Sequence, residues 1–395
     1  MSTEPPALSA NAIASIHMIE RLVGFATISA DSNLKLIEFA REHLAAHGFD
    51  SRLTFDDERR KANLFATIGP NCGGGIVLSG HTDVVPVSGQ SWASDPFRVE
   101  WRGDRLYGRG TADMKSFLAV ALTMAPVFRA SELRRPIHLA LSYDEELGCL
   151  GAPRMLRDIV ENNSKPALAI IGEPTSMRLV NRHKGTLAFR TTITGRDAHA
   201  SLTDRGLNAI ACAGEFLRFL ERLAAEHRSG PFDASFDPPY TTFNVGVIRG
   251  GTATNIIARH CELLWEFRPI PSIEPGALVQ RIRQFLEHEL LLRMRSCAPE
   301  AAIDTTALYH VPPLKPQSAS TTVEMIKALV GDDPAVGVAF GSEAGQFQQS
   351  GIPAIVFGPG SIEQAHQPDE YIEVAQVARC AAFMENVALW SASCE

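Results

Sequence analysis

The sequence predicts an α/β fold in which a mostly parallel sheet domain is interrupted by an inserted ferredoxin-like α+β domain. Three observations support this prediction. The chain has 395 residues, more than one hydrophobic core usually accommodates. Its first half alternates short apolar strands with helices, which is typical of a sheet covered on both faces. Its middle part changes to strands that alternate apolar and polar residues, and the first rhythm returns after the proline-rich joint VPPLKP.

The first part of the chain supplies the repeating strands and helices. Apolar residues at helical spacing predict helix between Asn11 and His47, with a break near TISADSN. Strands are expected in NLFATIG and GIVLSGHTD, because glycine or proline borders them. A helix, DMKSFLAVALTMAPVFRA, opens just after Asp113. The strand IHLALSYDEE, the helix GAPRMLRDIVENN and the buried strand PALAIIGEPT follow.

The pattern changes near Lys184. Four strands are expected in GTLAFRTTITG, TTFNVGVIRGG, HCELLWEFRP and AAIDTTAL, with amphipathic helices in GLNAIACAGEFLRFLERLAAEH and EPGALVQRIRQFLEHELLLRM. Their order, β-α-β-β-α-β, is that of a ferredoxin-like unit. We therefore predict an inserted domain at residues 185–308, between the two parts of the main domain at 1–184 and 309–395. The last part should contain the helices TTVEMIKALVG and DEYIEVAQVARCAAFMENVALW and the strand IPAIVFGPG.

Composition excludes several classes of function. The formal net charge is -8 and no Lys/Arg-dense stripe occurs, which argues against a nucleic-acid partner. No apolar run approaches a membrane span, and the N-terminal segment lacks the apolar stretch of a secretory signal. The chain has seven cysteines, an odd number, and none of them form a C-x-x-C motif. We therefore expect free thiols in a reducing cytoplasm. YGRGTAD has neither a phosphate-loop nor a dinucleotide pattern, which argues against nucleotide binding.

Metal-capable side chains follow the ends of the predicted strands, where open α/β sheets place their sites. Each has an ordinary alternative: a histidine after a strand can be a core or capping residue, Asp113 can be a helix cap, and the glutamates can lie in solvated turns. All of these alternatives would have to coincide at one edge of one sheet, which favours a site. The residues are His81, Asp83, Asp113, Glu145, Glu146, Glu173 and His366.

The donor set indicates which metals to expect. Two imidazoles and several carboxylates without a thiolate suit zinc, cobalt or manganese. Two ions fit better than one, with Asp113 bridging. His81 and Glu173 would then hold one ion, and Glu146 and His366 would hold the other, with a shared water completing each coordination. In this scheme the negative charges of Asp113, Glu146, Glu173 and a bridging hydroxide balance the charge of the two divalent cations.

Two acidic residues remain beside this predicted ligand set. Glu145 would lie next to the shared water and could act as general base, later protonating the leaving nitrogen. Asp83 lies two residues beyond His81 on the same side of an extended chain. It could accept the second ring N–H of that ligand and so fix its orientation.

The motifs SGHTDVVP, YGRGTADMK, YDEELGCLGA, IIGEPT and GPGSIEQAHQPDEY together resemble the M20 metallopeptidase family, most closely its acetylornithine deacetylase branch. The resemblance covers essentially the whole chain, including GRDAHASLTDRGLNAI and GGTATNIIA. It implies a zinc-exopeptidase-like catalytic domain with an inserted lid or dimerisation domain. It also implies the same dinuclear ligands, with Glu145 as the catalytic base.

The resemblance further implies residues that contact the substrate. His199 matches a histidine that the inserted domain lends to the partner subunit of a homodimer, where it stabilises the oxyanion. Asn255 and Arg268 match substrate-contacting positions, although EFRP departs from the usual Asp-Ile-Arg-Pro sequence, and a turn amide and a strand-end salt bridge are the alternatives. Glu343, beside Gly341 and Ser342, matches a pocket position and could attract a cationic side chain.

These features lead to one functional hypothesis and two alternatives. The hypothesis is a cytoplasmic zinc- or cobalt-dependent amidohydrolase that converts Nα-acetyl-L-ornithine to ornithine and acetate in arginine biosynthesis. The first alternative keeps the chemistry and changes the substrate to succinyl-diaminopimelate, another N-acyl amino acid or a dipeptide. The second is a non-catalytic binding protein on the same scaffold, which predicts loss of a ligand or of the base; all of them are present.

Overall fold

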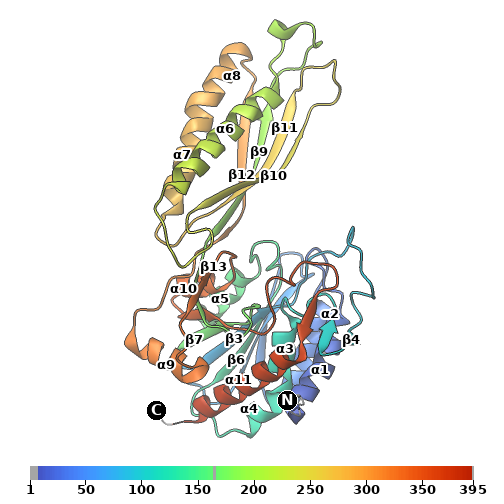
Figure 1. Ribbon diagram of the computed structural model, residues 1–395, viewed down its shortest axis with the longest axis vertical. Helices are drawn as coiled ribbons and strands as arrows, with labels where there is room; N and C mark the ends of the chain where they lie inside the picture. Colours follow the sequence, from blue (N-terminus) through green and yellow to red (C-terminus); the bar gives the residue numbers. More distant parts are fainter. Residues whose placement is uncertain (1–7, 163–165, 394–395) are drawn as a thin grey trace, which may run out of the picture. The chain divides into compact units, whose positions relative to one another are not determined.

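A computed structural model describes residues 8–162 and 166–393. Within these ranges the chain forms two compact units (Figure 1). The first runs to Arg182 and includes Leu314–Val336 and the chain from Ser342 onward. The second comprises His183–Pro313 and Gly337–Gly341, so the segment 185–308 lies inside it.

The described residues contain an eight-stranded sheet in the order β1-β2-β6-β3-β7-β14-β8-β13. The central strands β6, β3, β7 and β14 run parallel to one another. The pairs β1–β2, β2–β6 and β14–β8 are antiparallel. The predicted α/β fold with a mostly parallel large sheet is therefore confirmed. The strands are β1 Asp50–Phe55, β2 Ala62–Ile68, β3 Ile76–His81, β6 Ile137–Ser142, β7 Leu168–Ile171, β8 Val180–His183, β13 Val336–Val338 and β14 Ala354–Val356.

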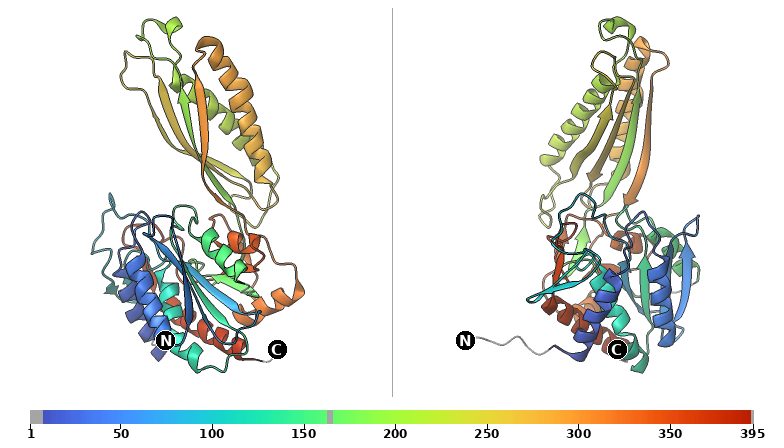
Figure 2. Two further views of the ribbon diagram at one scale, coloured as in Figure 1. Left: turned by 180° about the vertical axis from the view of Figure 1, so that it is seen from behind. Right: turned by 90° about the vertical axis from the view of Figure 1, so that its right-hand side faces the viewer.

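Helices cover both faces of this sheet, which explains why its central strands are apolar throughout (Figure 2). On β3, Ile76 and Leu78 pack in one core with Phe117 of α3, whereas Val77 between them is buried on the opposite face. Helices α1 and α11 pack against α3, and α10 packs against β7 and β14. The helices are α1 Ala10–Val23, α2 Leu34–Ala46, α3 Lys115–Thr123, α4 Ala125–Ala130, α5 Ala152–Glu161, α9 Ser320–Val330, α10 Ala344–Gln349 and α11 Val374–Ala392.

Two element predictions in this unit need correction. The helix expected over residues 113–130 is divided into α3 and α4, because Pro126 stands in the first turn of α4 and offers no backbone N–H. The helix expected from Asp369 begins only at Val374, because Tyr371–Glu373 form a short strand, β15, that pairs with β5. This strand belongs to a small antiparallel sheet with β4 Glu100–Arg102 and β5 Arg105–Tyr107.

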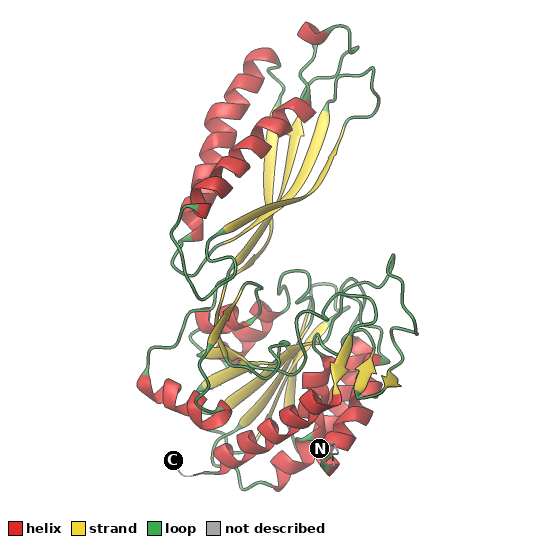
Figure 3. Ribbon diagram, viewed as in Figure 1, coloured by secondary structure: helices red, strands yellow, loops and turns green. Residues whose placement is uncertain are grey.

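The second unit has the predicted β-α-β-β-α-β order. Figure 3 shows its helices lying along one face of its strands. Its described sheet is antiparallel in the order β10-β11-β9-β12, and its helices share a core with it that includes Phe216, Trp265 and Phe285. This topology is ferredoxin-like. The elements are β9 Thr186–Thr194, the 3₁₀ turn η1 Thr203–Arg205, α6 Ala209–Arg228, β10 Thr242–Gly250, β11 His260–Arg268, α7 Pro275–Gln284, the π-helical stretch η2 Phe285–Leu290, α8 Leu291–Cys297 and β12 Ala302–Val311.

The structure also bears on the cysteines and on membrane insertion. All six described cysteines are free thiols, and Cys394 lies outside the described residues. The first seven residues of the N-terminal segment also lie outside them. None of the described helices combines the length and the apolar character that crossing a membrane requires.

Candidate metal centre

Polar side chains gather at the carboxyl ends of the parallel strands in the first unit. His81 ends β3, Glu145 and Glu146 follow β6, and Glu173 follows β7, while Asp113 precedes α3. Within the described residues, two overlapping groups have ligand atoms that all lie within 4.8 Å of one another. The first group is His81, Asp113 and Glu146, and the second is His81, Glu145 and Glu173.

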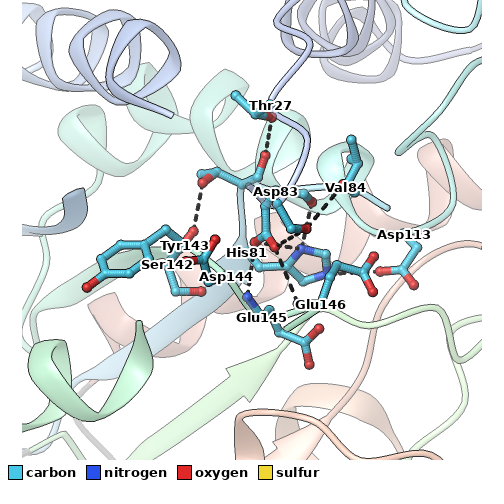
Figure 4. A network of polar contacts seen from close by, with 12 residues as sticks. Thr27, His81, Asp83, Val84, Asp113, Ser142, Tyr143, Asp144, Glu145 and Glu146 are labelled. Carbon is cyan, nitrogen blue, oxygen red and sulfur yellow. Dashed lines mark hydrogen bonds and ion pairs between the residues drawn. The ribbon is translucent and has the colours of Figure 1, made fainter. Parts of the chain in front are cut away.

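Asp113 faces both histidines with different oxygens. Its Oδ1 lies 2.9 Å from His81 Nε2, and its Oδ2 lies 3.4 Å from His366 Nε2. His366 Nε2 also lies 3.0 Å from Glu146 Oε2, and His81 Nε2 lies 3.9 Å from Glu173 Oε1. Two imidazoles at the two different oxygens of one carboxylate form the arrangement that a bridging ligand needs. Figure 4 shows His81, Asp113 and Glu146 turned toward one another.

The electrostatics of this cluster call for cations. Burial raises the pKa of Glu145 to about 8; His81 opposes this shift, and the charges of Glu146 and Asp113 add to it. Burial and the neighbouring carboxylates also raise the pKa of Glu173 well above its ordinary value. Among the described residues, Glu173 Oε1 is buried without a hydrogen-bond partner. Imidazole and carboxylate donors packed this closely, with an unsatisfied oxygen, fit divalent cations.

The two histidines respond to the same carboxylates. Hydrogen bonds to Asp113 and Glu146 raise the pKa of His366 to about 10, against the opposing effect of burial. Burial alone would lower the pKa of His81, but the nearby carboxylates of Asp113 and Asp83 raise it well above the ordinary value. Protons and metal ions therefore compete for these nitrogens, because metal ligation requires a neutral imidazole.

Asp83 organises the loop that follows β6. Its backbone carbonyl lies 2.9 Å from His81 Nδ1, closer than its carboxylate oxygen at 3.6 Å. The carboxylate instead accepts the backbone N–H groups of Glu145 at 3.1 Å and Glu146 at 3.3 Å (Figure 4). It also accepts the Ser29 hydroxyl at 2.7 Å. Asp83 thus fixes the His81 ring through its main chain and the two glutamates through its side chain.

A buried ion pair, which sequence reasoning did not identify, supports the same loop. Lys61 Nζ lies 2.6 and 2.7 Å from the two carboxylate oxygens of Asp144, the residue before Glu145. Asp144 has a φ of +53°, in the left-handed region that non-glycine residues seldom occupy. His366 has a φ of +64°. Strained backbone of this kind persists only where surrounding contacts enforce it, and it often occurs at functional sites.

Two glycines let α3 approach the ligand-bearing strands. A side chain at Gly80, next to His81, would meet Met114 and Leu118, and one at Gly172, next to Glu173, would overlap the ring of Phe117. Both strand ends therefore lie directly against the start of α3. The same helix start carries Asp113 beside them.

The remaining predicted site residues occupy different surroundings. Glu343 belongs to the first unit and is only 1% exposed, with Oε2 3.4 Å from Ser79 Oγ; burial raises its pKa to about 7. Arg268 belongs to the second unit, where its Nε donates to Glu266 Oε1 at 2.8 Å. His199 and Asn255 also belong to the second unit and are both exposed.

The structure brings His199 and Asn255 together on adjacent loops. The backbone of His199 bridges that of Ile256, and Ala200 N donates to Asn255 O at 2.9 Å. His199 Nδ1 accepts the backbone N–H of Ser201 at 3.2 Å and lies 2.8 Å from its hydroxyl. A neutral imidazole whose Nδ1 accepts carries its proton on Nε2. His199 therefore presents an N–H donor to solvent.

Known proteins resemble the chain along nearly all of its length. The peptidase family M20/M25/M40 matches residues 77–390. An acetylornithine deacetylase from Myxococcus xanthus is 36% identical over 395 residues, covering 97% of each chain. An M20 family metallo-carboxypeptidase from Sulfolobus solfataricus shares the fold with a TM-score of 0.76 at 18% identity, covering 95% of this chain and 99% of that one. A dinuclear metal-binding M20 peptidase from Bacillus subtilis has a TM-score of 0.65 at 15% identity, covering 96% and 98%.

Proposed function

Because the chain belongs to the M20/M25/M40 peptidase family and is a metal-dependent hydrolase, we propose that it removes the acyl group from an Nα-acyl-L-amino acid. Nα-acetyl-L-ornithine is the proposed substrate, and ornithine and acetate are the products, as a step of arginine biosynthesis in the cytoplasm. The 36% identity to an acetylornithine deacetylase over 97% of both chains supports this choice of substrate.

The observation that carries the proposal is the convergence of imidazoles and carboxylates on Asp113. In the proposed centre, His81, Asp113 and Glu173 hold one divalent ion, and Asp113, Glu146 and His366 hold the second. Zinc is the proposed metal, with cobalt as a substitute of the same donor preference. When bound, such ions polarise the acyl carbonyl and make a water molecule acidic near neutral pH.

Glu145 is the proposed proton carrier. It takes one proton from the attacking water and passes it to the departing amine nitrogen. The water's oxygen and its second proton leave with the acyl group as acetic acid, which ionises to acetate. The position of Glu145 suits this role, because its carboxyl oxygen lies within 4.8 Å of the ligand atoms of His81 and Glu173 and so beside the water that the ions would make acidic. Its Oε1 also accepts the Cys149 thiol at 3.3 Å, which restricts the carboxyl group's orientation.

The proposal assigns the second unit to oxyanion and substrate binding. His199 donates its Nε2–H to the oxygen that becomes negative during attack, from the partner subunit of a homodimer formed through this unit. Arg268 would bind the substrate carboxylate through its guanidinium, and Asn255 would donate an amide hydrogen bond nearby. Glu343 is buried, so its charge would act on a cationic side chain through the local field.

Acetate release from Nα-acetyl-L-ornithine tests the proposal. Activity should disappear when the metal is removed by a chelator and return when zinc is added to the stripped protein. A panel with other N-acetyl amino acids, N-succinyl-diaminopimelate and dipeptides should rank acetylornithine first by kcat/KM. Turnover that is indifferent to chelation would refute the metal-dependent mechanism, and a dipeptide ranked first would refute the substrate assignment.

A further inference from the structure

The loop that leads into Asp113 is held by a carboxylate from the far end of the chain. Glu370 is 1% exposed, and its Oε1 accepts the backbone N–H groups of Ala112 at 2.8 Å and Asp113 at 3.0 Å. Its Oε2 accepts the backbone N–H of Gly110 at 3.1 Å. Three backbone N–H groups within residues 110–113 therefore depend on one side chain.

Arg109 completes this arrangement and extends it to His366. Its guanidinium is 1% exposed and donates to Glu370 Oε2 at 2.7 Å and to Gln90 Oε1 at 2.5 Å. The amide nitrogen of Gln90 in turn donates to the backbone oxygen of His366 at 2.8 Å. A continuous network thus joins Asp113 to His366, which come from distant parts of the sequence.

General stabilisation is a poor explanation for these contacts. A buried ion pair contributes little net stability, because desolvation of the two charges offsets their attraction. Here both oxygens of Glu370 are used on the segment that carries Asp113, where Gly110 has a φ of +84°. The network fixes the direction of backbone groups next to two metal-capable side chains.

We propose that Glu370 and Arg109 are positioning residues that set the spacing between Asp113 and His366 and thereby the affinity and geometry of the two-metal centre. This inference rests on the proposed function for the roles of Asp113 and His366. Neither positioning residue needs to contact the metal or the substrate. Their effect passes through the backbone of one ligand segment and, by way of Gln90, through that of the other.

The Glu370→Gln variant tests the proposal, because it keeps the shape of the side chain but replaces one carboxylate oxygen with an NH₂ group. That NH₂ group would face N–H donors and could not accept their hydrogen bonds. Asp158→Asn is the control: Asp158 pairs with Arg52 at 2.9 Å in the same unit and touches none of the ligands. Metal affinity is measured by competition with a chromogenic chelator, and the cobalt-loaded proteins are compared by electronic absorption. Neither readout requires activity, and thermal unfolding of each variant is recorded alongside.

Glu370→Gln should weaken metal binding by about 10- to 100-fold, the range for residues that orient ligands, and should change the cobalt spectrum. Glu370→Asp should recover part of the affinity, and Asp158→Asn should leave both readouts unchanged. If Glu370→Gln does not fold, Arg109→Lys carries the same test. Unaltered affinity and spectrum in a folded variant, with only a lower unfolding temperature, would overturn the proposal. Wild-type protein that binds metal but deacylates nothing would instead refute the proposed function and leave this comparison valid.

Discussion

The two units present their candidate functional residues in opposite ways. In the first unit, His81, Asp113 and Glu173 are 1%, 6% and 4% exposed, and side chains from distant segments support the cluster. In the second unit, His199 and Asn255 are exposed and are positioned by pairing of their own backbones. Of the five proposed metal ligands these three are enclosed, whereas the His366 side chain is 50% exposed. The loop residues of the second unit must stay accessible to meet a passing substrate.

This difference predicts how substitutions should behave. Changes at the buried ligands of the first unit and at their supports should alter metal content, stability and rate together, because these side chains share one network. Changes at the exposed loops of the second unit should lower the rate alone. Glu145 is the informative exception in the first unit, since it is buried among the ligands but is assigned to proton transfer.

Replacement of Glu145 should therefore have the largest effect on turnover. Glu145→Gln keeps the size of the side chain but cannot take up a proton, so kcat should fall by about 10³-fold or more. Metal content, measured by elemental analysis, should stay at the wild-type level, because Glu145 is not among the proposed ligands. Full activity in this variant would require a different base.

His199→Ala should rank second, with kcat reduced by about 10²- to 10³-fold, the range for removal of one oxyanion donor. Metal content and thermal unfolding should be unchanged, because the side chain is exposed and its contacts are local. An equal fall in kcat with loss of metal would contradict the division between the two units.

Mixing the two inactive variants sharpens this test. In a heterodimer of His199→Ala and Glu145→Gln subunits, one site would combine an intact Glu145 with an intact His199 from the other subunit. Activity should therefore reappear after the subunits are exchanged by mild denaturation and refolding. No recovery in verified heterodimers would place His199 in its own subunit's site and contradict the proposed partner contribution.

Asp83→Asn should have a smaller effect, about 10- to 100-fold on kcat/KM, with weakened metal binding. The asparagine amide nitrogen would face a backbone N–H of Glu145 or Glu146 and lose one of those hydrogen bonds. The contact between the His81 ring and the Asp83 backbone carbonyl would remain, which limits the loss. A variant with normal metal affinity and rate would show that the loop is held without the Asp83 carboxylate.

The sequence could predict the metal-capable cluster because simple topology places it. His81 and Glu173 directly follow buried parallel strands, and the carboxyl ends of such strands meet at one edge. The ferredoxin-like unit was predictable for a similar reason, since its strands alternate and its helices are amphipathic. The local sequence pattern was enough to place a side chain wherever that side chain lies in or directly next to a regular strand or helix.

The supporting contacts could not be read from local pattern. Lys61 and Asp144 pair across the sheet, and Glu370 reaches a loop near Asp113, so both depend on the tertiary path of irregular segments. Glu370 stands near the end of the motif GPGSIEQAHQPDEY, which could have marked it as a residue of interest. Nothing in the sequence indicated which backbone groups it would bind. The strand β15 was missed because three residues are too few to show a period before the helical pattern of α11.

A substitution of His138, at the end of β6 opposite the metal centre, should have the smallest effect on activity but a clear effect on stability. His138 lies near the start of this strand, 4% exposed, with its ring stacked on Phe65 and Nδ1 2.8 Å from Thr67 Oγ1. Burial, with a smaller contribution from Arg52, lowers the pKa of His138 from 6.5 to about 4. Unlike the histidines of the metal centre, it is held neutral by its surroundings.

The folded protein should therefore lose stability in acid through His138. Between pH 6.5 and about 4, His138 is protonated in the unfolded chain but stays neutral in the folded chain. The free energy of unfolding therefore falls by about 1.4 kcal/mol for each pH unit. His138→Phe should keep the stacking on Phe65 and flatten this part of the stability profile, with activity at neutral pH unchanged. Denaturant midpoints measured at intervals between pH 7 and 4.5 test this, with the exposed His288→Gln as control. Equal acid sensitivity in wild type and His138→Phe would mean that the buried ring does accept the proton, and that the two ends of β6 differ less than the structure implies.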